Sequence, residues 1–333
     1  ISDCLVGSEM CIRDRPMGEL HGKHLVTIEG LNMEHLSAVQ NAMVDCGGTQ
    51  CGYCTPGFVV CMTAGLMAPQ VPLNEEGVLY AISGNLCRCT GYQSIKDAGF
   101  QAIQSLRDQL INKERIKALV EAKALPTYFL GIAERLKAIE PDEILEMGLQ
   151  HRGRTIVAGG TDLYVQRGEQ LAESSITLLN NESEISPAIA SEGRVIIDAR
   201  MTFEAFATDP LIKTHLQEIY DYNLLMASWP IRTRSTIGGN LCNASPIADM
   251  TCLLLALECS LTLTSPGGHR RELPLNEFYL GYKQLNKEPD EVLTDISFPV
   301  FSKNAYVNWE KVSKRAWLDL SLIHISEPTR QSL

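Results

Sequence analysis

Apolar side chains recur at helical spacing in the first third of the chain. Leu36, Val39 and Met43 follow one another at intervals of three and four positions, and a longer apolar stripe runs from Ile95 to Leu110. Residues at this spacing share one face of a helix. The pattern therefore predicts two amphipathic helices in this region.

Two shorter helices are predicted between these stripes. Thr55 before Pro56 is a capping residue followed by a proline at the first helical position, and it opens the run PGFVVCMTAGLM. Asn74 caps the run EEGVLYAIS, and Gly84 stands where glycine ends a helix. Four helices with short connections predict a small bundle. A further charged helix, QSLRDQLINKERIKALVEAKAL, is predicted to run toward Pro126.

The pattern changes to strands and helices in the second half of the chain. RTIVAGG, SITLLNN and RVIIDA are predicted strands, and IADMTCLLLALE is a predicted helix that leads into the strand CSLTLTS. The fold class is therefore α+β with several domains. The two ends resemble translated sequencing adapter, so the natural chain is expected to be longer. The expected parts are an artefactual start (1–15), a helical bundle (16–110), a linker (111–140), an incomplete α/β domain (141–320) and an artefactual end (321–333).

Composition narrows the class of protein. The chain has 333 residues, of which 45% are hydrophobic and 21% are charged, as in soluble globular proteins. A net charge of -11 disfavours a nucleic-acid partner, which needs a positive surface, and no apolar run is long enough to predict a membrane span. The 11 cysteines follow no secretory signal, which predicts a cytoplasmic protein whose cysteines bind metal rather than form disulfides.

Five cysteines stand in two short motifs, CGGTQCGYCTPG and GNLCRCTGY. Thiolates in close pairs suit zinc or an iron–sulfur cluster. Cys46, Cys51, Cys54 and Cys87 match the C-x4-C-x2-C…C order of plant-type ferredoxins, whereas replacing Cys46 by Cys89 gives C-x2-C…C-x-C. The plant-type loop lies in a β-rich domain, but helices are predicted on both sides here. The flanking pattern therefore favours the second set.

The motifs TQCGYCTPGF and GNLCRCTGYQSI resemble the helical [2Fe-2S] domain of the molybdenum hydroxylases, the xanthine dehydrogenase and aldehyde oxidase group. The resemblance implies that Cys51, Cys54, Cys87 and Cys89 bind the cluster, and that Gln50 lies near the pterin of the molybdenum cofactor. The alternative is a zinc ion that only holds the bundle together.

Two glycine pairs are the candidate cofactor loops of the second half. The chain has no G-x-G sequence, so it lacks the fingerprint of a Rossmann dinucleotide site. Gly159 and Gly160 end the strand of TIVAGGTDLYV, and Gly238 and Gly239 lie in RSTIGGNLCNASPIADM. Glycine lets backbone N–H groups approach a phosphate closely, but each pair alone also fits a tight turn.

This half resembles the vanillyl-alcohol-oxidase-like, PCMH-type FAD-binding domain of the same family. The resemblance implies flavin contacts from a first loop, a second loop and three further positions, one of which, Met226, stands where the family has an aromatic residue. No side chain is predicted to be an acid, a base or a nucleophile. The implied contacts are Ile156, Val157, Ala158, Gly159, Gly160, Thr161, Asp162 and Leu163, then Thr236, Gly238, Gly239 and Asn240, and finally Met226, Asp249 and Leu293.

The resemblance implies an oxidoreductase component. The expected activity is electron transfer from purine oxidation, of xanthine or hypoxanthine, at a molybdopterin cofactor on a large partner subunit, through [2Fe-2S] to FAD and then NAD. A second [2Fe-2S] cluster is expected in the full assembly. Carbon monoxide, aldehyde and aromatic hydroxylases are alternatives within the family. A zinc-stapled, nucleotide-binding scaffold without redox activity is the alternative outside it.

Overall fold

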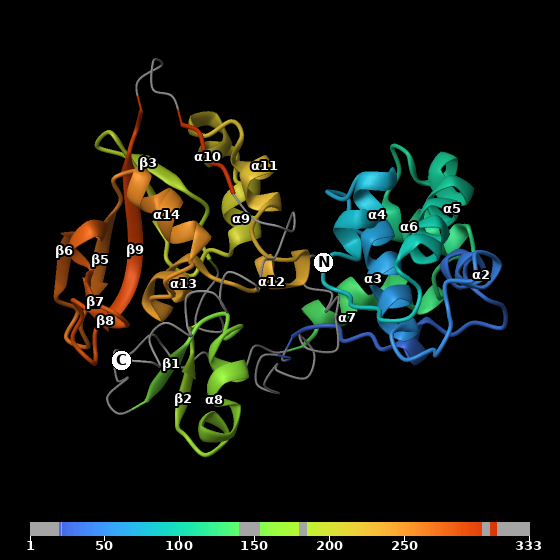
Figure 1. The fold of residues 1–333 in the computed structure, drawn as a ribbon, viewed down its shortest axis with the longest axis horizontal. Helices are drawn as coiled ribbons and strands as arrows, with labels where there is room; N and C mark the ends of the chain where they lie inside the picture. The colour runs from blue at the N-terminus through green and yellow to red at the C-terminus, as the bar shows by residue number, and fades with distance from the viewer. Residues whose placement is uncertain (1–19, 21, 140–153, 180–184, 302–306, 312–333) are drawn as a thin grey trace. The chain divides into compact units, whose positions relative to one another are not determined.

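A computed structural model describes residues 20, 22–139, 154–179, 185–301 and 307–311. The chain divides into two compact units, Ile1–Asp142 and Glu143–Leu333, which are treated separately here. Both are visible in Figure 1. The predicted artefactual ends and the predicted domain boundary at residue 141 lie outside the described residues. No helix in the described part of the chain is both long and apolar enough to cross a bilayer.

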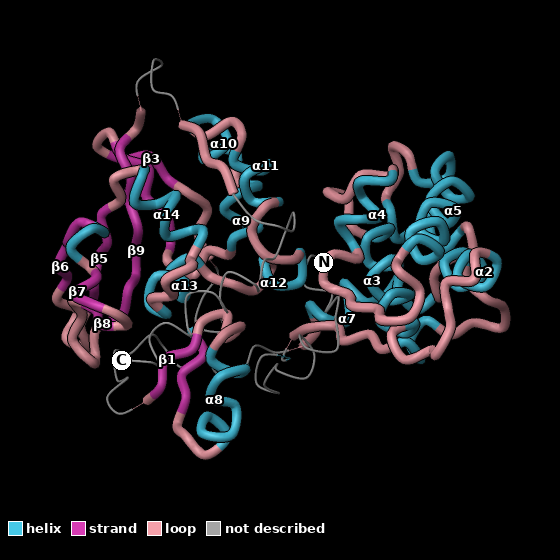
Figure 2. The backbone as a smooth tube through the Cα atoms, in the orientation of Figure 1, coloured by secondary structure: helices cyan, strands magenta, loops and turns pink. Residues whose placement is uncertain are grey.

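The first unit is a bundle of helices, as Figure 2 shows, and its buried apolar side chains form one core. The long helix α5 packs against α2 and α4, and α3 contacts both α2 and α4. The helices are α2 (Ala38–Asp45), α3 (Thr55–Met67), α4 (Glu75–Ala81), α5 (Gln93–Leu110), α6 (Arg115–Glu121) and α7 (Ile132–Lys137), with short 3-10 turns η2 (Ile28–Leu31) and η3 (Thr127–Gly131).

Capping side chains determine where these helices begin. Ser37 and Gln40 form a reciprocal capping box, so α2 starts after Ser37 rather than at the start of its apolar stripe. Asn74 accepts a hydrogen bond from the Gly77 amide, which confirms it as the cap of α4. The cap of α3 is Cys54 and not Thr55, which is the first residue of the helix.

The predicted charged helix toward Pro126 is wrong as a single element. α5 ends at Leu110, and Asn112 has a left-handed φ of 58°, which breaks the helical path. The Glu114 carboxylate then accepts hydrogen bonds from two backbone amides of α6, at 3.1 and 2.7 Å. A local N-cap thus starts a new helix within a sequence that has helical propensity throughout.

Much of the segment predicted as a linker, 111–140, is helical, and part of it is packed in the core. Its helical part belongs to the first unit, because α6, η3 and the residues between them contribute buried side chains to the same core as α2, α3 and α5. These side chains are Ala118, Leu119, Ala124, Leu125 and Phe129.

The second unit contains two parts, named here the small lobe and the large lobe. The small lobe pairs β1 (Thr155–Val157) in parallel with β2 (Ile176–Leu178), joined by α8 (Leu163–Ala172). The large lobe has an antiparallel sheet in the order β3-β4-β9-β5-β6. Its strands are β3 (Ile189–Ser191), β4 (Arg194–Asp198), β9 (Val292–Pro299), β5 (Ser260–Thr264) and β6 (Arg270–Pro274).

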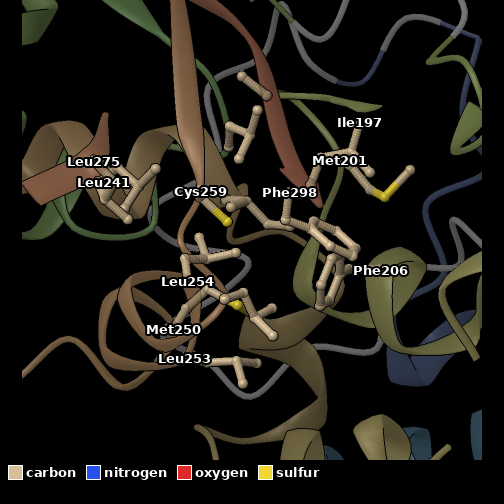
Figure 3. Packing of buried hydrophobic residues seen from close by; sticks show 14 of the residues in the cluster. Ile197, Met201, Phe206, Leu241, Met250, Leu253, Leu254, Cys259, Leu275 and Phe298 are labelled. Atoms are coloured by element: carbon tan, nitrogen blue, oxygen red, sulfur yellow. The ribbon is translucent and has the colours of Figure 1, made fainter. Parts of the chain in front are cut away.

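Helices cover one face of the large sheet. Burial alternates along β4 and β5, as expected for strands with one covered face, and the buried side chains pack on those of the helices (Figure 3). The helices are α9 (Phe203–Thr208), α10 (Pro210–His215), α11 (Ile219–Leu224), α12 (Trp229–Arg232), α13 (Ile237–Asn243) and α14 (Asp249–Ala256), and a hairpin of β7 (Tyr279–Gly281) and β8 (Gln284–Leu285) follows.

A β-bulge in β9 keeps its apolar side chains on the covered face. The register against β5 shifts between Thr262 and Leu263, so β9 has one extra residue there. Leu293 and Ile296 are consequently both buried although three positions separate them. The carbonyl of Thr294 accepts a hydrogen bond from the Ala199 amide at 2.9 Å. The bulge thereby fixes the backbone beside the end of β4.

Candidate functional site

The first candidate site is a group of sulfur atoms on two loops of the first unit. Cys51 and Cys54 precede α3, while Cys87 and Cys89 lie between α4 and α5. The loops turn through positive φ angles, among them 84° at Gly52 and 65° at Gly91. The two cysteine motifs therefore meet at the N-terminal ends of α3 and α5.

Side-chain and backbone hydrogen bonds hold these loops in place. The Tyr92 hydroxyl accepts from the Cys87 amide at 2.9 Å, and Tyr92 itself adopts a left-handed φ of 71° as the cap of α5. On the other loop, the hydroxyl oxygens of Thr49 and Thr55 lie 3.0 Å apart. The cysteines are thus positioned by the folded loops themselves.

The four sulfurs form two pairs, each with one member from either loop. The Sγ of Cys89 lies 3.4 Å from the Sγ of Cys51, and the thiol of Cys54 interacts with that of Cys87. Cys46 is outside this arrangement, because its thiol donates to Oε1 of Gln101 at 3.2 Å.

Each sulfur pair contains one thiol whose pKa is lowered and one whose pKa is raised. Burial raises the pKa of Cys87, but hydrogen bonds from Thr90 and from the Cys89 amide outweigh it and lower the pKa to about 7. Burial and the bond to Cys87 raise the pKa of Cys54 to about 11. In the other pair, a hydrogen bond from the Tyr53 amide lowers the pKa of Cys51, and the bond to Cys51 raises that of Cys89.

The donor set fits two irons better than a single ion. A structural zinc site needs four ligands around one centre, whereas each iron of a [2Fe-2S] cluster takes two cysteine sulfurs. Two pairs of sulfurs on helix-flanked loops match the second requirement.

The second candidate site is a cavity of about 440 Å³ in the second unit. Both glycine pairs line it, the first from the loop after β1 and the second from α13. Twelve of the 15 positions implied as flavin contacts line this cavity: Ile156, Ala158, Gly159, Gly160, Thr161, Asp162, Leu163, Thr236, Gly238, Gly239, Asn240 and Leu293.

Close backbone approach explains why glycine stands at two of these positions. A Cβ on Gly159 would lie 2.0 Å from the Arg234 carbonyl oxygen, and one on Gly238 would lie 2.8 Å from the Ala199 carbonyl oxygen. Gly238 and Gly239 do not end a strand as the first pair does. They lie in the first turn of α13, whose cap, Thr236, accepts from the Gly239 amide at 3.1 Å.

Three implied flavin contacts do not line the cavity. Val157 is fully buried beneath the first loop, and Met226 is a core residue of the large lobe with 1% of its surface exposed. Asp249 is in the first turn of α14, where its Oδ2 accepts a hydrogen bond from Nζ of Lys311 at 2.7 Å.

Hydrogen bonds join the small and large lobes around the cavity. Arg234 donates from Nη2 to the Gly159 carbonyl at 3.1 Å, and the hydroxyls of Thr161 and Ser235 lie 3.0 Å apart. Arg200 lines the cavity and donates to the carbonyl of Leu179 at 3.3 Å, from the large lobe to the end of β2.

Sequence reasoning missed several charged residues of this cavity. Arg200 is neutralised by a bidentate ion pair with Asp198, with a shortest distance of 2.5 Å. Arg154, Lys283 and Lys287 add positive charge to the lining. For Arg200, the available signal was its position two residues after Asp198, the last residue of the apolar strand RVIID. Lys283 lies in the turn between β7 and β8, Lys287 follows β8, and neither had a comparable signal.

The fold and the two sites define a cofactor-binding chain with an iron–sulfur unit and a flavin unit. The chain matches the family described as FAD binding domain in molybdopterin dehydrogenase over residues 134–301, about half of its length, and the [2Fe-2S] binding domain over residues 27–99. It belongs to the molybdopterin dehydrogenase family. The predicted fold class and the prediction of [2Fe-2S] and FAD are confirmed by these matches.

The chain is similar to several known proteins. Xanthine dehydrogenase/oxidase from Mus musculus is 27% identical over 92% of this chain and 27% of its own length, and xanthine dehydrogenase from Oryza sativa is 23% identical over 93% of this chain and 28% of its own length. The chain thus spans just over a quarter of these relatives. A solved carbon monoxide dehydrogenase from Oligotropha carboxidovorans is 29% identical, with a TM-score of 0.46, over 49% of this chain and 57% of its own.

Proposed function

We propose that this chain is the iron–sulfur and flavin component of a molybdenum hydroxylase that oxidises xanthine or hypoxanthine and passes the electrons to NAD. Oxidation would take place at molybdopterin on a partner subunit, which would carry a large share of the relatives' remaining length. The observation that carries the proposal is the pairing of four sulfurs across two loops, next in sequence to a domain with a glycine-lined cavity.

In this proposal, Cys51 and Cys89 hold one iron, and Cys54 and Cys87 hold the other. Deprotonated sulfur is the ligand, so the thiol protons leave when metal binds. Thr90 favours the thiolate of Cys87 through its hydroxyl and its amide. The Tyr53 amide does the same for Cys51. When bound, the cluster and the flavin would supply the one- and two-electron chemistry of the relay.

The cavity residues hold and orient the flavin. The loop from Ile156 to Leu163 and the first turn of α13 both line the cavity, and glycine lets them pack closely on the backbone of Arg234 and Ala199. Glycine-rich segments of this kind can offer backbone amides to a phosphate. Arg154, Lys283 and Lys287 supply positive charge that suits a pyrophosphate. Leu293, placed at the cavity by the β9 bulge, supplies apolar surface. The corresponding domains are proposed at 16–139, with α6 and η3 included in the iron–sulfur domain, and at 141–320.

The first experiment is cofactor analysis of the purified chain. We expect about two irons and about two acid-labile sulfides per chain, together with one bound FAD. One zinc without sulfide would reject the redox function in favour of a structural metal. With the molybdenum-binding partner added, we expect xanthine-dependent NADH formation. Turnover of an aldehyde or carbon monoxide but not of xanthine would change the substrate and leave the electron-transfer role in place.

A further inference from the structure

The first unit has a second cavity that is separate from the sulfur pairs. It has a volume of about 500 Å³ and lies where α3 and α5 end and α6 begins. The cysteines lie at the opposite ends of α3 and α5. At a rise of about 1.5 Å per residue, the length of α3 alone places this cavity roughly 20 Å from the sulfurs. It therefore does not belong to the cluster site.

Three cationic side chains line this cavity: Arg107, Lys113 and Arg115. Arg115 is half-buried and donates to the carbonyl oxygens of Leu66 at 3.1 Å and Val71 at 3.3 Å. Burial lowers the pKa of the Arg115 guanidinium, since its charge is partly removed from water. The two carbonyls fix its position but do not neutralise it.

No carboxylate offsets these charges. Asp and Glu are absent from the described lining of the cavity, and no ion pair joins its three cations to an acid in the part of the chain that the structure describes. Glu114, which stands between Lys113 and Arg115 in the sequence, directs its carboxylate to backbone amides of α6. The lining of the cavity is therefore positively charged, although the whole chain has a net charge of -11.

Apart from Asn74 and Asn112, the rest of the lining is apolar. Pro69, Pro72 and Ile111 form part of the wall, and Ile111 has 42% of its surface exposed. The volume falls within the range of small-molecule sites, about 300–1,000 Å³. A ligand that matches both features has an anionic group for the cations and an apolar body for the prolines and Ile111.

We propose that this cavity binds an organic phosphate of nucleotide size. Its phosphate groups would lie between Arg107, Lys113 and Arg115, and its apolar ring against Pro69 and Pro72. Such a site would allow a metabolite to bind the iron–sulfur unit without competing for the flavin cavity.

The test is isothermal titration of the full chain, saturated with FAD, with ATP as the probe. Adenosine and inorganic phosphate, titrated separately, report the apolar and anionic contributions. We expect ATP to bind more tightly than either, without release of flavin. No measurable binding of ATP at about 1 mM, or heat accompanied by flavin release, would overturn the proposal.

Charge-reversal variants make the test specific. Arg107→Glu and Lys113→Glu change exposed side chains, and each is expected to weaken ATP binding by about tenfold or more through loss of a charge-assisted contact. Lys117→Glu, an equal charge change on an exposed residue of α6 outside the lining, should bind ATP as the parent does. Equal weakening in all three would show a net-charge effect and reject the site.

A second arm separates binding from a structural role. If the cations only stabilise the carbonyl ends of α3 and α5, Arg107→Gln and Lys113→Gln will lower the melting temperature but leave ATP affinity unchanged, and the proposal fails. Should a Glu variant not fold, these Gln variants replace it in the titration, with Lys117→Gln as their control.

Discussion

The Sγ atoms of Cys51 and Cys89 lie 3.4 Å apart, although 38 positions separate the two residues in the chain. The pairing therefore depends on the packing of α3 against the helices that flank the second loop. A site built in this way forms only when the bundle is folded, so binding of the metal and folding of the bundle stabilise each other.

We predict that Cys87→Ser abolishes the cluster whereas Cys46→Ser retains it. Cys87 pairs with Cys54, while the Cys46 thiol is used by Gln101. Iron and sulfide content, visible absorbance and the electron paramagnetic resonance signal of the reduced protein measure the difference. Loss of the cluster in both variants would favour the plant-type ligand set.

We predict that Gly159→Ala destabilises the second unit and weakens FAD binding. The new Cβ would lie 2.0 Å from the Arg234 carbonyl, so the loop must move away from the large lobe, at a cost of about 1–3 kcal/mol or more. Gly168→Ala, in α8, is the matched control, because open space surrounds that position. Urea unfolding and flavin-fluorescence titration measure both effects, and similar behaviour of the two variants would contradict the prediction.

We predict that Arg200→Ala lowers FAD affinity by about tenfold, the equivalent of one charge-assisted hydrogen bond. Arg200 connects Asp198 in the large lobe to the Leu179 carbonyl beside the cavity. Arg270→Ala removes a more exposed pair, with Asp295, and should change neither affinity nor stability by more than about 1 kcal/mol. Unchanged FAD affinity in Arg200→Ala would show that the lobes are held by their other contacts.

We predict that Glu291 contributes to the acid sensitivity of the second unit. The Arg271 guanidinium, 2.7 Å from its carboxylate, lowers the pKa of Glu291 from its ordinary value of 4.5 in the folded state. A carboxyl with a lowered folded pKa stabilises the protein fully above its unfolded pKa, and this contribution is lost as the pH falls through the folded pKa.

Glu291→Gln should therefore be less stable than the parent at pH 7, and the gap should narrow as the pH falls below about 4.5. Urea midpoints between pH 3 and 7 measure this. A gap that stays constant across the range would assign the effect to packing. Glu277→Gln, which changes a carboxylate in the turn after β6, provides a reference without this ion pair.

Much of the bundle could be predicted from the sequence because its signals are local. The stripe from Ile95 to Leu110 and the cap at Asn74 depend on neighbours within a turn or two, and both elements form as predicted. The predicted strands RTIVAGG, SITLLNN, RVIIDA and CSLTLTS contain β1, β2, β4 and β5 for the same reason.

The remaining features depend on contacts that periodicity does not contain. Gly238 and Gly239 resemble a turn after a strand in the sequence, but Thr236 caps a helix there. Glycine stands at position 238 because a Cβ would collide with Ala199. To predict the role of Arg200, one would have to know that the end of β2 lies near the end of β4. The cysteine motifs suggested a shared centre, but which sulfur meets which depends on how two loops pack.

The packing of α6 and η3 onto the bundle has a practical consequence for anyone who produces the iron–sulfur unit alone. A recombinant fragment that stops near residue 110 would expose the apolar surface that Leu119, Leu125 and Phe129 cover. An exposed apolar patch of this kind promotes self-association in the expression host. Extending the fragment to residue 139 keeps that surface covered, so the yield of monomer should rise.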